Sequence, residues 1–144
     1  LRLAEMIARV AKHPNGPTTV SVLSGDVHHS YAARAEWAGD AARPAGATVY
    51  QLVCSPVHNY VPLLVKPAFS LGWSRPAGTL TRWWARRRGV PPLPLSWANT
   101  RGPLFGNTIA TLQVDGRSAE VLFEQPRGPV VLDEVGRVPL SRTS

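Results

Sequence analysis

Residues that can bind metals or transfer protons gather in one short stretch near the N-terminus. The run Val20–Leu23 ends at Ser24–Gly25, and Asp26, His28 and His29 follow within four residues. In an extended or tightly looped backbone, side chains two positions apart point the same way, so Asp26 and His28 could reach one metal ion or one pair of ions. A carboxylate beside an imidazole suits Zn, Mn, Fe or a mixed site. His29 would point elsewhere, towards substrate or solvent.

The segment that presents these residues is predicted to be a buried strand. Residues 18–24 are rich in β-branched and apolar side chains, the pattern of a strand covered on both faces. Residues 2–12 carry apolar side chains at helical spacing and predict an amphipathic helix. A helix, a short turn and a buried strand form half of a β-α-β unit, whose other half would lie upstream. The structural alternative is a strand that ends in a polar turn, in which Asp26 caps backbone amides.

The rest of the chain predicts further strands and a helical insertion. Alternating apolar residues and turn residues predict strands at 30–37, 48–54, 95–99, 108–114 and 119–125, with a short helix as the alternative at 30–37. The segments between them are predicted as a loop at 38–47 and a Pro-rich insertion at 57–94, which holds helical pieces interrupted at Pro62 and Pro67 and a helix at 79–88. Asp115-Gly116 is a strong hairpin signal between the last two strands. We expect residues 127–144 to form an extended tail that is loosely packed or depends on a partner segment.

Composition and charge fit one globular domain. The chain has 144 residues, of which 44% are hydrophobic and 17% charged, and this balance argues against disorder and against a fibrous protein. The formal net charge is +7, and all but two of the 16 basic residues are arginine, whose guanidinium group binds planar anions. The single Cys54 lies in a predicted strand, so we expect a packed thiol and no internal disulfide. No apolar run approaches the ~18 residues of a membrane span, and the first residues lack the pattern of a signal peptide.

Three blocks of sequence together resemble a known enzyme family. The stretch SVLSGDVHHSY at 21–31 resembles the last metal-binding motif of the PhoD-like (alkaline-phosphatase-D-like) metallophosphatases, which belong to the calcineurin-like superfamily. The stretch YQLVCSPVHN at 50–59 resembles the strand and Ser-Pro turn that follow in those proteins, and residues 102–125 resemble their C-terminal hairpin. The blocks cover about a third of the chain, in the order found in the family. Where the superfamily usually has Gly-His-x-His, this chain has Gly-Asp-x-His, the variant typical of the PhoD-like branch.

This resemblance implies a fold and a reaction. The fold would be α/β, the C-terminal part of a calcineurin-like αββα sandwich in which β-sheets are flanked by helices. Asp26 and His28 would be metal ligands in a two-metal site for divalent or trivalent ions, with Ca, Fe, Mn and Zn all compatible. The metals would bind the phosphate oxygens of a phosphoester substrate and activate water for hydrolysis. His29 and His58 are the local candidates for protonating the leaving group; alternatively, His58 is a loop histidine bonded to backbone.

One departure from the family limits what this chain can do alone. The other ligands of the superfamily come from upstream motifs, and none of these occurs in residues 1–144. We therefore expect residues 1–126 to be the C-terminal portion of a metallophosphatase domain that supplies only the last metal-binding motif. Its partner would be the missing N-terminal portion of the same domain. The 144 residues alone should show negligible hydrolysis.

Two other interpretations remain open. The chain could be a truncated, non-catalytic remnant of such an enzyme. It could also be an Arg/Trp-rich binding module, because residues 82–88 interleave tryptophan with arginine in a way that suits nucleic acid or an anionic membrane. The simpler explanation of 82–88 is an amphipathic helix with Trp83 or Trp84 packed and the arginines solvated. On balance we expect no nucleic-acid partner.

Overall fold

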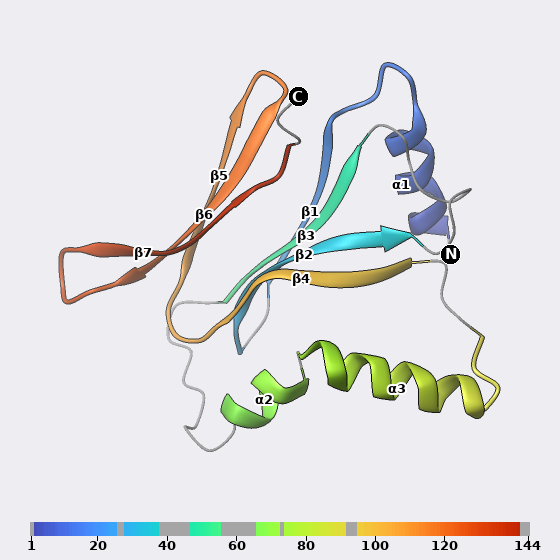
Figure 1. Ribbon diagram of the computed structural model, residues 1–144. Helices are drawn as coiled ribbons and strands as arrows, with labels where there is room; N and C mark the ends of the chain where they lie inside the picture. The colour runs from blue at the N-terminus through green and yellow to red at the C-terminus, as the bar shows by residue number, and fades with distance from the viewer. Residues whose placement is uncertain are drawn as a thin grey trace.

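The computed structural model describes residues 2–25, 28–37, 47–55, 66–72, 74–91 and 95–141. Two β-sheets and a few helices make up this mixed α/β structure (Figure 1). The elements, in chain order, are α1 (Arg2–Lys12), β1 (Thr19–Gly25), β2 (Ser30–Trp37), β3 (Thr48–Cys54), α2 (Lys66–Gly72), α3 (Arg75–Arg87), β4 (Leu95–Leu104), β5 (Ile109–Asp115), β6 (Ser118–Pro126) and β7 (Leu132–Pro139). All five strands predicted after the first are present, and β4 is longer than expected. No helix in these ranges is both long and apolar enough to cross a bilayer.

The first sheet has the strand order β1-β3-β2-β4. β1 and β3 are parallel, whereas β2 runs antiparallel to both of its neighbours. The prediction that 18–24 is a strand is confirmed, but the prediction that it is buried on both faces is wrong. β1 is an outer strand with one described neighbour, so its residues are half-buried or exposed, and Leu23 is 64% exposed. The doubly buried strand is β3, which lies between β1 and β2.

Successive side chains of β3 point to opposite faces of the first sheet, and each face packs against a different layer. Tyr50 and Leu52 point to one face, where they pack against the second sheet through Phe123 of β6. Val49 points to the other face and packs in a cluster with Ala11 of α1. The described layers are therefore α1, the four-stranded sheet and the antiparallel sheet β5-β6-β7, as Figure 1 shows.

The C-terminal residues belong to the second sheet. As predicted, they are extended, and β7 pairs with β6 in antiparallel register. The expectation of loose packing is wrong, because Val138 and Leu140 lie in the core between the sheets. The Asp115-Gly116 hairpin is confirmed: Asp115 pairs with Ser118, and Gly116 has a φ of 55°.

Helices α2 and α3 form an arm between β3 and β4 that lies apart from both sheets (Figure 1). Pro67 lies in the first turn of α2, where its missing N–H costs no hydrogen bond, and the helical piece predicted before it is outside the described residues. The predicted helix at 79–88 is confirmed and starts four residues earlier. Ser74 caps it, because its Oγ accepts a hydrogen bond from the Ala77 N–H at 3.4 Å. Pro62 and most of the predicted loop at 38–47 are outside the described residues.

Gly102 in β4 is a position where any side chain should be costly. Its φ is +103°, and a Cβ there would lie 2.8 Å from both the Ser30 carbonyl oxygen and the Tyr31 Cβ. We expect Gly102→Ala to lower the free energy of unfolding by about 2–4 kcal/mol, measured by urea denaturation. Gly89→Ala is the matched control: its φ of +77° carries similar strain in open space, so about 1 kcal/mol is expected. Equal losses in the two variants would show that the contact with β2 is unimportant.

Candidate functional site

Four chain segments meet at one edge of the first sheet. Gly25 at the end of β1 is in register with Cys54 at the end of β3, so the carboxyl ends of the parallel pair lie together. The antiparallel strand β2 starts at the same edge, where Ser30 is opposite Leu104 at the end of β4. Ligand and catalytic groups of α/β proteins commonly lie at the carboxyl ends of parallel strands. The segment containing His28 and His29 connects two of these strand ends.

A buried hydrogen bond fixes the geometry of this edge. The Ser55 N–H donates to the Ser30 Oγ at 2.7 Å, and both residues are buried. This bond joins the start of β2 to the point where the chain leaves β3. The neighbouring Cys54 is half-buried, as expected of a packed thiol, and its Sγ–H donates to the Thr108 carbonyl at 3.2 Å. The ends of β1 and β3 and the start of β2 are therefore held together at this edge.

The two histidines differ sharply in environment. His28 is exposed, whereas His29 is only 5% exposed. The His29 ring stacks on Tyr31, with ring centroids 5.4 Å apart, and lies 6.0 Å from the Phe105 ring. The expectation that His29 points towards solvent is wrong, because the residue just before β2 shares a face with Tyr31 two positions later. Of these two histidines, His28 is the one on the surface, where a ligand from solution can approach it.

Two residues at this edge were not singled out from the sequence. Phe105 covers His29, and its carbonyl accepts a hydrogen bond of 2.9 Å from Gln125 Nε2 in the second sheet. Lys66, the first residue of α2, places its ammonium nitrogen 5.7 Å from the Phe105 ring centroid. Nothing in the local spacing of Lys66 marks it, because it reaches this edge only through tertiary folding. Its ammonium group gives this edge of the sheet a cation that can attract an anion.

Asp26 and His58, two of the four predicted site residues, lie outside the described residues. Both belong to segments that begin at this edge: Asp26 directly follows Gly25, and His58 comes three residues after Ser55. Within the part of the chain that the structure describes, no group of three or more His, Cys, Asp or Glu side chains could hold a metal ion. His28 alone could therefore donate only one ligand to a metal shared with other residues. Comparison with protein-family models, curated proteins and solved structures finds no match to this chain.

Proposed function

We propose that this chain is the C-terminal part of a PhoD-like, metal-dependent phosphoester hydrolase, to whose two-metal site it contributes Asp26 and His28. The observation that carries the proposal is the exposed imidazole of His28 beside the joined carboxyl ends of β1 and β3. A neutral imidazole and a carboxylate are compatible ligands for Zn, Mn or Fe. The fold supports the proposal at a coarser level, since two packed sheets and a helix layer are compatible with a sandwich flanked by helices.

The residues around His28 suit a phosphoester substrate. Bound metals would neutralise the phosphoryl oxygens and supply an activated water. The Lys66 ammonium group, at the same edge, would attract the charged ester and help to orient it. His58, which follows Ser55 by three residues in the sequence, is the second candidate for protonating the leaving group. His29, enclosed by Tyr31 and Phe105, is better suited to holding the backbone beside His28 in place.

The remaining ligands would come from a segment outside these 144 residues. β1 pairs with β3 on one side, and no described strand pairs with its other side. A groove of about 350 Å³ runs between the start of β1 and the β5–β6 hairpin, and its lining includes Thr19, Ser21, Leu112 and Val114. We propose that the additional segment adds a strand parallel to β1, with α1 as the crossover helix that follows it. This completes the β-α-β unit that the sequence predicts.

The reading frame upstream of Leu1 is the first test. In-frame sequence that contains Asp-x-His-like and Gly-Asn-His-like segments supports the enzyme. A stop codon immediately upstream would contradict it and favour a truncated, non-catalytic remnant.

Metal content of the protein that includes the upstream segment is the second test. We expect Asp26→Ala and His28→Ala each to lose at least one bound metal ion by elemental analysis, because each removes one of its ligands. His13→Ala is the matched control. His13 is an exposed histidine at the end of α1, where its Nδ1 accepts the Asn15 N–H at 3.2 Å. Unchanged metal content in both site variants would refute the assignment.

A further inference from the structure

Helix α3 carries an apolar patch on its surface. Leu80, Trp83 and Trp84 are 64%, 49% and 58% exposed, and their spacing places them on one side of the helix. Leu80 and Trp83, with Pro76 and Thr79, line a shallow and mostly apolar hollow. The expectation that one of the two tryptophans is packed is therefore wrong. A contiguous exposed patch of this kind marks an interaction site more often than a neutral surface.

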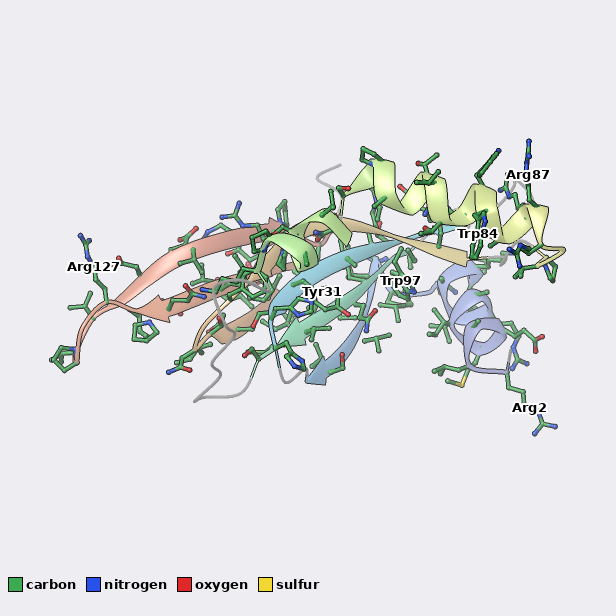
Figure 2. All side chains as sticks on the ribbon, turned by 90° about the horizontal axis from the view of Figure 1, so that it is seen from below. Arg2, Tyr31, Trp84, Arg87, Trp97 and Arg127 are labelled. Carbon is green, nitrogen blue, oxygen red and sulfur yellow. The ribbon has the colours of Figure 1, made fainter. Side chains whose placement is uncertain are left out.

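Cationic groups lie beside the patch. Residues 75–88 contain five arginines besides the tryptophans and no acidic residue. The guanidinium carbon of Arg87 lies 4.4 Å from the Trp83 ring centroid, and that of Arg88 lies 4.6 Å from the Trp84 centroid. Figure 2 shows Arg87 projecting from the C-terminal end of α3, away from the sheets. A fitting partner must therefore combine negative charge with an apolar layer.

We propose that α3 binds the surface of an anionic lipid bilayer. The helix would lie flat in the headgroup region, with Leu80, Trp83 and Trp84 inserted and the arginines on lipid phosphates. Tryptophan favours this interface because its ring is apolar and its N–H can still reach water or a headgroup. With 13 residues, α3 is about 20 Å long, too short to span the bilayer but sufficient to lie along it.

The same contacts leave less aromatic surface on which the bases of a single-stranded nucleic acid could stack. Such binding needs open aromatic faces on which bases stack. Here a guanidinium group covers one face of Trp83 and one face of Trp84. The hollow beside Leu80 also offers nothing to a phosphate backbone, whereas acyl chains can fill it. Nucleic acid is therefore the rival outcome of the test.

The position of α3 in the fold allows this binding without rearrangement. The α2–α3 arm lies apart from the two sheets, so a surface can approach it directly (Figure 1). The proposal does not depend on the phosphoesterase assignment.

The test is flotation of the 144-residue chain with lipid vesicles, which separates vesicle-bound chain from oligomers of the chain itself. We expect binding to phosphatidylcholine vesicles that contain about 30% phosphatidylglycerol and at least tenfold weaker binding to pure phosphatidylcholine. Raising salt from about 50 to 300 mM should weaken binding strongly, because surface charges are then screened. Tryptophan emission should shift to shorter wavelength on binding, and Trp83→Phe combined with Trp84→Phe should remove most of that shift.

Variants separate the roles of charge and apolar contact. Arg86→Glu, Arg87→Glu and Arg88→Glu together should weaken binding at least about 100-fold. The matched control is Arg2→Glu, Arg9→Glu and Arg127→Glu, which makes the same charge change at exposed positions outside the arm and should cost far less. Trp83→Ala with Trp84→Ala should weaken binding about tenfold while leaving the circular dichroism spectrum unchanged.

Several results would overturn the proposal. These are an equal loss of vesicle affinity in the control variant, binding that does not depend on phosphatidylglycerol, or no binding of the unmodified chain. Tighter binding to a single-stranded oligonucleotide than to the anionic vesicles would replace it with the nucleic-acid interpretation. The emission shift needs no variant for its detection, so it still reports vesicle binding if a substituted chain fails to fold, and the Phe variant assigns that shift to Trp83 and Trp84.

Discussion

Replacing His28 with alanine should lower kcat/KM for phosphoester hydrolysis by about 10³-fold or more in the protein that includes the upstream segment. The imidazole is exposed beside the carboxyl ends of β1 and β3, so under the proposed function it is a metal ligand and not part of the packing. Under that function, its removal would weaken the binding of a metal ion whose charge would stabilise the transition state. Asp26→Ala should have an effect of the same order, and steady-state kinetics with a chromogenic mono- or diester measures both.

Three controls make this result interpretable. His13→Ala should change kcat/KM by less than about twofold, because that exposed histidine lies at the end of α1 and not at the candidate site. The 144-residue chain alone should show negligible hydrolysis, which tests for a contaminating phosphatase. Saturating metal should partly rescue His28→Ala if the variant has lost affinity and not folding. Full activity in both Asp26→Ala and His28→Ala would exclude the proposed site.

Phe123→Ala should be the most destabilising single substitution in the core. Phe123 is fully buried between the sheets, in a cluster with Tyr50 and Leu52 of β3 and Val138 of β7. Truncation removes a large apolar side chain and leaves a cavity, so the free energy of unfolding should fall by about 3–5 kcal/mol. Urea denaturation followed by circular dichroism measures the loss.

Val114→Ala is the matched control for this core substitution. Val114 lies in the neighbouring strand β5 but is exposed, so the expected change is within about 0.5 kcal/mol. A loss below about 1 kcal/mol for Phe123→Ala would mean that the two sheets do not share a rigid core in solution.

Local sequence patterns predicted most of the helices and strands but not how deeply each one is buried. Periodicity located α1 and β3, and Asp115-Gly116 located the β5–β6 hairpin, because these features depend on neighbours in the chain. An apolar run like that of β1 occurs in central and in outer strands alike, so the exposure of β1 could not be predicted from it. Residues 127–141 lacked clear periodicity, and their burial depends on pairing with β6.

The candidate site, too, was predictable only where it depends on neighbours in the chain. The Asp26–His28 spacing directed attention to the edge of the sheet where β1 and β3 end, since the end of β1 is predictable from the local sequence. The enclosure of His29 could not be predicted, because Phe105 is 76 positions away in the chain. Lys66 was missed for a similar reason: its contact with Phe105 joins the start of α2 to the turn after β4.

The two outer strands of the first sheet also differ in how they resist aggregation. β4 contains Arg101 and Pro103, residues that discourage another chain from adding to an edge. β1, with the sequence TVSVLSG, has no charge and no proline. We therefore expect a second copy of the purified chain to pair with β1. Sedimentation at rising protein concentration would reveal these oligomers. We expect Leu23→Lys to place a charge at an exposed position of β1, which should prevent this pairing and keep the chain monodisperse.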